Sequence, residues 1–525
     1  MTDQISDLFI IGGGINGTGI ARDAQGRGLQ VTLAEMNDLA SATSSASTKL
    51  FHGGLRYLEY FEIKLVKKAL IERETLLKAM PHISWPMRFV LPYHQGMRFE
   101  TSTPASRLLS ILMPWAKGRR PAWMIRLGLF LYDHLGGRDI LPGTTTLDLA
   151  LDPTGAPLNE KYRKAFEYSD CWVEDARLVV LNARDAADRG AEILVRTKVI
   201  AAVRDGALWR IETENAATAE RRTHLARALV NAGGPWVEDI VKGIARINTS
   251  EGIRLVQGSH IVTKSLFDHG KSYFFQGEDG RIVFAIPYEI DFTLIGTTET
   301  EYHSDPANAA CTDEEADYLL KFANRYFKRR LSRNDIVWSY SGVRPLYADG
   351  SRSATAATRD YVLSLNQNGP PILSVFGGKI TTYRKLAEGA LKMLSPYFPD
   401  AVQNWTAGVP LPGGDFPVDG VAAQIDGLFA EFPFLDRAWS RRLVRAYGTE
   451  ARDILEGAKS EEDLGVGFGA TLTAAEVTWL MQNEFARSAE DVVWRRSKLG
   501  LRMSSDEIAD LDKWMLSQPL ARSVD

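Results

Sequence analysis

Three glycines near the amino terminus have the spacing that binds a dinucleotide. Gly12, Gly14 and Gly17 follow a short apolar run and open a segment of helical character. The first glycine permits a tight turn, the second leaves room for a pyrophosphate, and the third lets the helix approach a neighbouring strand. The start of the helix then offers free N–H groups and the positive end of its dipole to the phosphates. This pattern predicts a dinucleotide-binding site.

An acidic residue completes the pattern. Residues 8–11 and 30–34 have the composition of buried parallel strands, and Glu35 ends the second of them. We expect its carboxylate to accept hydrogen bonds from the adenosine ribose. The turn at 36–38 contains no Arg or Lys that could bind a 2′-phosphate, and this argues against NADP.

The composition of the chain restricts its class. A length of 525 residues with 45% hydrophobic composition predicts two or three domains. The net charge of −4 and pI of about 6.2 give no sign of a nucleic-acid partner. Cys171 and Cys311 stand far apart, without a CxxC motif or a Cys/His cluster, which suits a reducing cytoplasm and argues against a structural metal. We find no signal-peptide pattern and no spanning apolar stretch, so we expect the chain not to cross a membrane.

Several elements would position the candidate residues. The apolar residues within 62–79 have the spacing of a helix. A second helix is predicted at 179–189, followed by a strand that contains Thr197 and Val199. The alternating runs 282–287 and 292–296 predict a hairpin, so an antiparallel sheet is inserted between the dinucleotide-binding pieces.

Further motifs extend over nearly the full chain. They are HGGLRYLE from His52, EYSDCWVEDARL from Glu167, NAGGPW from Asn231, QGSH from Gln257, YSGVRPL from Tyr340, TRDY from Thr358 and FGGKITTYRKLAE from Phe376. Together with the glycine turn they closely resemble the bacterial FAD-dependent glycerol-3-phosphate dehydrogenases. At residues 12–35 and 231–234 the chain is similar to the broader D-amino-acid-oxidase-like flavoproteins, whereas 52–57 and 376–384 are more specific to the glycerol phosphate group.

The resemblance and the residue patterns together predict the fold class. We expect an α/β, Rossmann-like FAD-binding domain with an inserted antiparallel-sheet substrate domain and a C-terminal helical domain. The expected boundaries are an oxidoreductase region at 1–408, in which the FAD-binding pieces are about 1–80, 168–240 and 355–395 and the insertions include a basic and apolar segment at 80–135, and a helical domain at 409–525.

The resemblance implies FAD and the residues around it. Gly377 and Gly378 precede a helix that begins near Ile380, where backbone donors and the helix dipole would stabilise negative charge on a reduced flavin. Thr381 and Thr382 stand in its first turn, where hydroxyls cap the helix or reach the ring. The residues that the resemblance implies for the cofactor are Gly12, Gly14, Ile15, Asn16, Gly17, Glu35, Thr43, Ser44, Ser47, Lys49, His52, Gly53, Gly54, Leu55, Val199, Asn231, Ala232, Gly234, Trp236, Gly377, Gly378, Lys379, Ile380 and Thr381.

The implied substrate is a small phosphorylated polyol, so the pocket must hold a dianion above the flavin. Arg56, Arg344 and Lys379 fall in three separate motifs and are expected to converge on that anion as catalytic and substrate-binding groups. His260 is the best placed of the eight histidines to be a general base, with a core histidine as the alternative, and His52 is equally ambiguous. Tyr57 and Thr382 complete the expected substrate-binding set.

The resemblance predicts oxidation of sn-glycerol 3-phosphate to dihydroxyacetone phosphate, with hydride transfer from C2 to flavin N5 and electrons passed to quinone. One enzymatic alternative is a dehydrogenase that oxidises a longer polyol phosphate, such as erythritol phosphate. A second is an oxidase that passes the electrons to oxygen. A third alternative is a flavin-bearing binding or sensor protein without turnover. The oligomeric state is left open, with a homodimer as one alternative.

A local basic and apolar segment indicates a membrane partner. Glu100 is the only acid between Ala79 and Tyr132, and residues 93–120 look like an insertion relative to the family. The basic residues there are Arg88, Arg98, Arg107, Lys117, Arg119, Arg120 and Arg126. Apolar and aromatic residues at 108–131 lie between them, as in segments that bind an anionic interface. We therefore expect a cytoplasmic protein attached peripherally to the inner face of the cell membrane, with a packed helical hairpin as the alternative.

Overall fold

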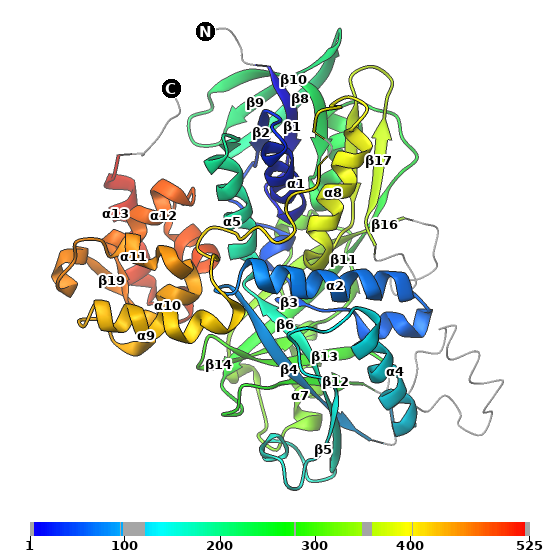
Figure 1. Cartoon of the computed structure of the whole chain (residues 1–525), viewed down its shortest axis with the longest axis vertical. Coiled ribbons are helices and arrows are strands. Elements are labelled where there is room, and N and C mark those ends of the chain that lie inside the picture. The colour runs from blue at the N-terminus through cyan, green and yellow to red at the C-terminus, as the bar shows by residue number, and fades with distance from the viewer. Residues whose placement is uncertain are drawn as a thin grey trace.

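The computed structural model contains two large sheets and a separate C-terminal lobe (Figure 1). It describes residues 5–94, 96–97, 121–277, 280–348, 360–401 and 403–519, and for Arg56 the backbone alone. In these residues, no helix is both long and apolar enough to span a membrane.

The first sheet has eight strands and a mainly parallel centre. Its central path runs β17–β18–β10–β1–β2–β7, and β1 pairs in parallel with both β2 and β10. The strands are β1 Ser6–Ile11, β2 Val31–Ala34, β7 Glu192–Leu194, β8 Thr197–Asp205, β9 Leu208–Asn215, β10 Arg221–Asn231, β17 Val362–Asn366 and β18 Ile372–Phe376. Buried runs such as Leu8–Ile11 are apolar on successive residues because this sheet is covered on both faces.

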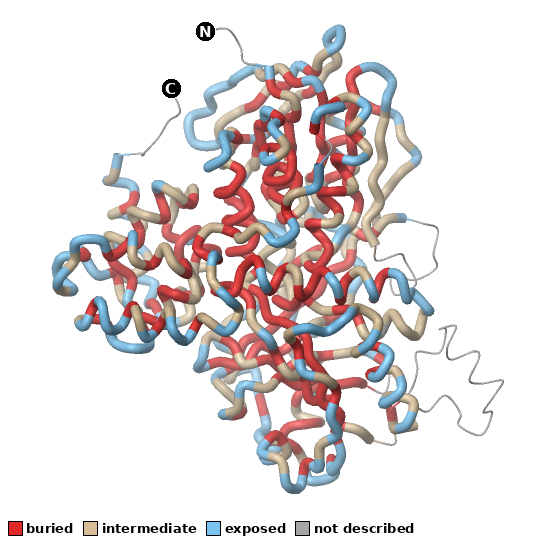
Figure 2. The backbone as a smooth tube through the Cα atoms, in the orientation of Figure 1, coloured by how far each residue is buried: buried red, intermediate tan, exposed pale blue. Residues whose placement is uncertain are grey.

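Three helices from distant parts of the chain lie together against this sheet (Figure 1). They are α1 Ile15–Gly26, α5 Asp175–Asp188 and α8 Tyr383–Leu394. Leu8 and Ile10 of the sheet pack with Ile20 of α1 and Leu386 of α8 in one core cluster. Figure 2 shows the buried residues concentrated along these helices and the sheet behind them.

The second sheet has ten strands, nearly all antiparallel, which confirms the predicted inserted sheet. The expected hairpin is present, with Ala285 opposite Ile295. The strands are β3 Leu50–Phe51, β4 Ser84–Tyr93, β5 Thr145–Asp148, β6 Lys164–Val173, β11 Ile253–Lys264, β12 Ser272–Gln276, β13 Ile282–Tyr288, β14 Phe292–Gly296, β15 Thr300–Glu301 and β16 Ile336–Tyr347. The chain crosses from this sheet to α5 immediately after β6, so residues 168–173 of the expected FAD-binding piece are strand residues of the second sheet.

The C-terminal lobe has its own core. Leu428, Leu443, Val477 and Leu480 are buried together in it. Its principal helices are α9 Val421–Glu431, α10 Arg437–Tyr447, α12 Ala474–Asn483 and α13 Ser505–Ser517. A small hairpin of β19 Gly467–Gly469 and β20 Leu472–Thr473 stands among them, which the helical prediction did not include.

The helix α4, Ala122–Leu135, belongs to the basic and apolar segment, and α2, Ile63–Ala79, directly precedes that segment. α2 matches the predicted helix, and α4 follows the part of the predicted insertion that lies outside the described residues. Arg88, one of the basic residues predicted for a membrane partner, is partly buried. Its guanidinium binds Glu167 at 2.7 Å and carbonyl oxygens of the 142–143 loop, because strand β4 directs it onto β6.

Candidate active site

A cavity of about 900 Å³ is lined by residues of both sheets. Its walls include the β1–α1 turn, the loop 40–48, the start of β8 and the turn 232–236. Residues of β16 and the turn 377–380 complete it. Sequence segments separated by more than 300 residues therefore meet at one site.

The glycine turn has the predicted geometry. Gly12 has φ of +110°, and a Cβ at this position would lie 2.6 Å from the Ala232 carbonyl oxygen. A Cβ at Gly17 would lie 1.9 Å from the Gly12 carbonyl oxygen, so this glycine lets helix and strand meet rather than lining the cavity. Gly14 is the N-cap of α1 and lines the cavity. The positive end of the α1 dipole therefore faces the space that a pyrophosphate would fill.

Glu35 stands where the sequence pattern predicts it, at the end of β2 in the cavity wall. Its carboxylate accepts hydrogen bonds from the N–H groups of Gly13, at 2.7 Å, and Asn37, at 2.8 Å. Burial raises the pKa of this carboxyl, while the two N–H donors oppose the shift. Glu35 thus fixes the glycine turn and also offers oxygen atoms to a ligand.

A second glycine turn also lines the cavity. Gly377 and Gly378 have φ of +74° and +110°, conformations that favour glycine. The Asn16 side chain donates to the Gly377 carbonyl at 3.0 Å, which ties this turn to the start of α1. Asn16 Oδ1 is buried and accepts no hydrogen bond from the described residues. The cavity wall therefore holds a buried acceptor that a ligand donor can satisfy.

Two cationic side chains, Arg344 and Lys379, also line the cavity. Arg344 reaches Thr297 Oγ1 at 3.4 Å, and Lys379 Nζ lies 3.8 Å from the centre of the Tyr57 ring. Thr297 and Tyr57 line the cavity as well. This wall can hold an anion beside the dinucleotide turns.

The sequence over residues 7–384 matches the family described as FAD dependent oxidoreductase. The chain belongs to this family. Residues 404–511 match the C-terminal domain of alpha-glycerophosphate oxidase, in agreement with the predicted C-terminal helical domain.

The similar proteins match this oxidoreductase over nearly its whole length. It is 49% identical to the D-erythritol 1-phosphate dehydrogenase of Brucella abortus, with 97% of this chain and 98% of that protein covered. It is 48% identical to a glycerol-3-phosphate dehydrogenase of Pseudomonas aeruginosa, with 98% and 96% covered. The structure of the Bacillus halodurans glycerol-3-phosphate dehydrogenase complexed with FAD has a TM-score of 0.72, 26% identity and coverage of 98% and 95%. FAD is the cofactor that the oxidoreductase uses.

Most of the residues predicted to bind FAD line the cavity. These residues are Gly12, Gly14, Ile15, Asn16, Glu35, Thr43, Ser44, Ser47, His52, Gly54, Leu55, Val199, Ala232, Gly234, Trp236, Gly377, Gly378, Lys379 and Ile380. The two glycine turns, the acid and the free Asn16 oxygen fit a dinucleotide. Direct contacts of each residue with FAD stay a prediction.

Other residues of that set stand behind the wall. Lys49 was expected to line the FAD, but its fully buried ammonium binds Asp175 at 2.7 Å, and Asp175 in turn accepts from Ser47 Oγ. Asn231 holds the backbone of the following turn through Val237 and Gly233. Gly17 and Gly53 also stand outside the lining.

The segment after Lys379 begins as a 3₁₀ turn, Ile380–Thr382, before α8 starts at Tyr383. Thr381 and Thr382 are each 1% exposed, and Thr381 Oγ1 accepts from the His52 N–H at 3.3 Å. Neither threonine lines the cavity that we expected Thr382 to enter.

His260 lies behind the cavity wall. Its Nε2 is 3.0 Å from Thr48 Oγ1, its ring stacks on Tyr340 at 4.8 Å, and only Thr48 of these residues lines the cavity. Burial, followed by the charges of Arg344 and Lys49, holds the pKa of this imidazole well below its usual range. His260 is therefore neutral near pH 7 and contacts the cavity through the Thr48 hydroxyl.

Some of the residues that line the cavity were not predicted from the sequence. Thr48, Tyr168 and Asp170 line the cavity, and the last two belong to the motif from Glu167 that carried the resemblance without a role. The side chain of Arg56 lies outside what the structure describes. Within the described residues, no group of three His, Cys, Asp or Glu side chains could hold a metal ion.

Proposed function

We propose that this oxidoreductase oxidises C2 of a phosphorylated polyol, with sn-glycerol 3-phosphate as the leading substrate and dihydroxyacetone phosphate as the product. The observation that carries the proposal is the position of Arg344 and Lys379 in the same cavity as the dinucleotide turns. The names of the full-length relatives support the substrate class. Bound FAD supplies the acceptor for the hydride that leaves C2.

The cationic wall has two distinct tasks in this proposal. Arg344 presents a planar guanidinium that can bind two phosphate oxygens at once. Lys379 supplies a compact charge whose direction is restricted by the Tyr57 ring beneath it. A dianion bound between these groups would orient the carbon chain of the substrate.

We assign His260 as the base that accepts the hydroxyl proton when C2 loses its hydride. The neutral imidazole can accept a proton, and Thr48 stands between the ring and the cavity at hydrogen-bond distance from Nε2. The Thr48 hydroxyl would receive the substrate proton and pass its own to Nε2. Histidine is the side chain that most often serves in general acid–base catalysis.

A longer substrate is the main enzymatic alternative. The chain is 49% identical to an erythritol phosphate dehydrogenase and 48% and 46% identical to two glycerol-3-phosphate dehydrogenases. Sequence identity therefore does not distinguish a three-carbon substrate from a four-carbon substrate. Oxygen instead of quinone as the acceptor is a second alternative. A flavin-bearing sensor without turnover is the non-enzymatic alternative, which the paired cations and the base argue against.

Anaerobic reduction of the holoenzyme tests the proposal. Substrate should reduce the flavin and so bleach its absorption band at about 450 nm. We would compare glycerol 3-phosphate, erythritol phosphate and unphosphorylated glycerol at equal concentrations. Bleaching by a phosphate ester but not by glycerol supports the proposal, and the faster ester identifies the chain length. An unchanged spectrum with every phosphorylated polyol contradicts it, and reoxidation by a soluble quinone analogue or by air separates the two acceptors.

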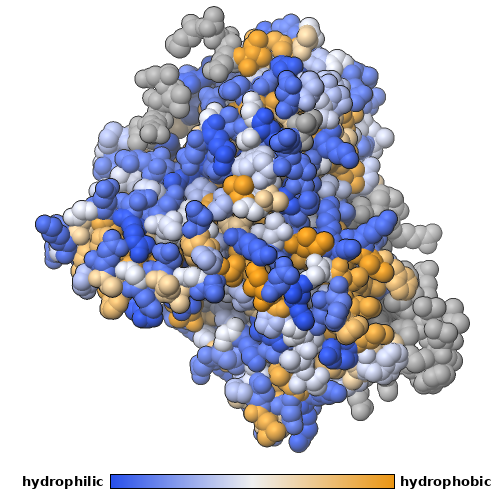
Figure 3. Space-filling model, in the orientation of Figure 1, coloured by the Kyte–Doolittle hydropathy of each residue, from blue (hydrophilic) through white to orange (hydrophobic). Residues whose placement is uncertain are grey.

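We further propose that α4 attaches the protein to an anionic membrane on the cytoplasmic side, beside its quinone. Trp123, Leu127, Phe130 and Leu131 recur on one face of α4 and are 45–57% exposed. Figure 3 shows apolar side chains gathered over the region of α2 and α4. An outward face of this kind, with a Trp and basic neighbours, is typical of helices that lie in the interface.

The beginning of α2 extends this face. Phe61 and Ile63 are about half exposed, and Lys64 and Lys67 are exposed beside them. Basic side chains near an anionic leaflet add about 1 kcal/mol each. Most of the basic residues predicted for this role, from Arg98 to Arg120, lie outside the described residues, and Arg126 on α4 is exposed.

A further inference from the structure

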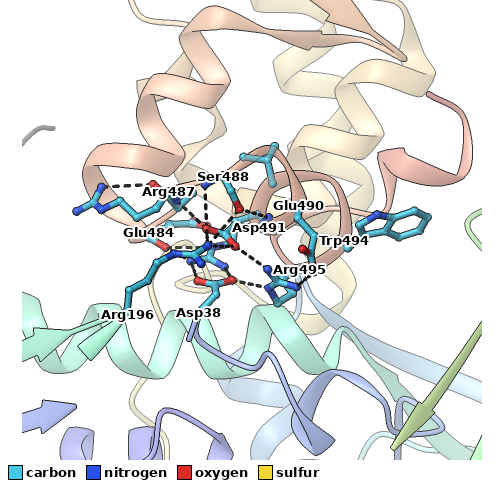
Figure 4. A network of polar contacts seen from close by, with 12 residues as sticks. Asp38, Arg196, Glu484, Arg487, Ser488, Glu490, Asp491, Trp494 and Arg495 are labelled. Atoms are coloured by element: carbon cyan, nitrogen blue, oxygen red, sulfur yellow. Dashed lines mark hydrogen bonds and ion pairs between the residues drawn. The ribbon is translucent and has the colours of Figure 1, made fainter. Parts of the chain in front are cut away.

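The turn that follows Glu35 is held by the C-terminal lobe. Asp38 is 2% exposed, and both of its carboxylate oxygens bind arginines that come more than 450 residues later. Arg495 Nε donates to Asp38 Oδ2 at 2.5 Å, and Arg496 donates to both oxygens, including Oδ1 at 2.8 Å. Figure 4 shows Asp38 pointing toward the arginines of the C-terminal lobe.

The arginines are themselves fixed within the lobe. They belong to a π-helical segment, Asp491–Arg496, a rare conformation that places both guanidinium groups toward Asp38. Arg496 is fully buried and also donates to the Glu484 carbonyl through Nε and Nη2. Asp491 accepts from Arg495 Nη2 at 2.6 Å. The π-helical segment is therefore a rigid receptor for one carboxylate.

Arg196 makes a second attachment to the same turn. Its backbone N–H donates to the Asn37 carbonyl at 2.8 Å, and its guanidinium binds both oxygens of Asp491. The next residue, Thr197, donates its N–H to the Glu35 carbonyl at 2.8 Å. The backbone on both sides of Asn37 is thus connected to the lobe, once through Asp38 and once through Arg196.

The arginines of the cluster keep Asp491 ionised. Burial disfavours an ionised Asp491, but Arg496, Arg495 and Arg196 outweigh this effect and hold the pKa of the carboxyl at about 2. Removing one member of such a network leaves a buried charge without its partner, so the cluster is rigid at neutral pH.

The opposite side of this turn faces the cavity. Glu35, Met36 and Asn37 line it, together with Thr197 and Val199 after Arg196. We propose that Asp38 and Arg196 are positioning residues for the adenosine end of FAD, and that the C-terminal lobe, through Asp491, Arg495 and Arg496, clamps this end of the cofactor site. In this proposal the C-terminal lobe slows the release of FAD. This inference rests on the proposed placement of the adenosine at Glu35.

The same domain interface offers a matched control. Arg184 of α5 binds Glu450 of the lobe at 2.6 Å, with both side chains less than a fifth exposed. This pair joins the same two bodies, but neither residue contacts the 35–38 turn in the described structure. A general loosening of the interface would affect both sites, whereas a clamp on the turn would affect only one.

The test measures FAD release from holoenzyme. Purified wild type, Asp38→Asn, Arg196→Gln and Arg184→Gln are diluted into buffer, and free flavin is followed by its fluorescence. Heating each protein gives a second readout, the temperature of FAD release against that of unfolding by circular dichroism. We expect about tenfold faster release from D38N and R196Q, which corresponds to 1.4 kcal/mol. Their FAD should leave below the unfolding temperature, while R184Q stays within twofold of wild type.

Equal release rates in R196Q and R184Q would overturn the clamp, as would release that coincides with unfolding in every variant. Arg196 is one-third exposed, so R196Q keeps the test decisive if D38N does not fold. Glu35→Arg tests the adenosine placement separately. Loss of FAD from E35R with wild-type retention in R196Q overturns the clamp alone, whereas full retention in E35R overturns the placement itself.

Discussion

The Tyr132 phenol oxygen accepts a hydrogen bond from the Gly53 N–H at 2.7 Å and donates to Asp170 at 2.7 Å. Tyr132 is on the inner face of α4, opposite the exposed apolar residues, and Asp170 lines the cavity. Gly53 stands between the lining residues His52 and Gly54. One hydroxyl therefore connects the helix that we assign to the membrane with the wall of the active site.

We predict that Tyr132→Phe weakens this connection. The change removes one of the hydrogen bonds that the buried Asp170 accepts, beside the one from Arg73 at 2.6 Å, and leaves the Gly53 N–H with only a long contact of 3.4 Å to Asp170 among the described residues. A poorly satisfied buried group costs about 1–3 kcal/mol. kcat/KM should fall about tenfold with FAD retained. Tyr383→Phe is the control, since among the described residues its buried hydroxyl accepts a single long hydrogen bond, of 3.3 Å, from Asn182. Similar losses in both variants would show that Tyr132 contributes to packing alone.

Glu35→Arg should lose FAD. The substitution replaces the two accepted hydrogen bonds at the glycine turn with a buried cation, and it removes the oxygens offered to the ribose. The ratio of flavin to protein absorbance after purification measures the loss. Glu192→Arg, on the neighbouring β7, is the control. A full flavin spectrum in the Glu35 variant would refute the assignment.

Arg344→Ala should lower kcat/KM by roughly two decades, because a charge-assisted contact with a desolvated anion contributes a few kcal/mol. FAD content should not change. Arg254→Ala is the matched control, since Arg254 lies on the adjacent strand β11 and pairs with Glu301 away from the cavity lining. Unaltered kcat/KM in the Arg344 variant excludes it from the substrate site.

His82 should make stability depend on pH. Burial, followed by Arg177 and Arg445, lowers its pKa from 6.5 to about 3. The unfolded chain binds the proton more readily than the folded chain, so this contribution is full above pH 6.5 and is lost as pH falls toward 3. The loss is about 2 kcal/mol between pH 6.5 and 5. Thermal midpoints of wild type and His82→Asn at both pH values measure it, and an equal pH dependence of the two proteins contradicts the prediction.

The membrane face should respond to substitution on α4. Leu127→Asp with Phe130→Asp places charges on the exposed face and should shift the protein from anionic liposomes to the supernatant, with FAD kept. Neutralising Arg107, Lys117, Arg119 and Arg120 together should have the same effect, and high salt should loosen the attachment of the wild-type protein. Leu516→Asp, at an exposed apolar residue of α13, is the control. If the α4 variant still sediments with the liposomes, this face is not the membrane anchor. If the substitutions instead dissociate a dimer, the face binds a second copy of the chain.

Local patterns in the sequence predicted much of the fold. The glycine turn, α2, the β13–β14 hairpin and the turn at Gly377 were all expected, because each depends on backbone preferences or on side-chain periodicity over a few residues. The same local logic predicted Glu35 at the end of its strand. The resemblance added FAD and located Arg344 and Lys379 in the motifs that meet at the cavity.

Tertiary structure decided which charges meet. The turn at 36–38 contains no basic residue of its own, yet folding brings Arg196, Arg495 and Arg496 to it. Lys49 is directed to Asp175 rather than the cavity, and His260 is separated from it by Thr48. Sequence patterns report the conformation of neighbouring residues, whereas these pairings depend on how strands and helices hundreds of residues apart pack. A buried charge must find a partner wherever the fold supplies one.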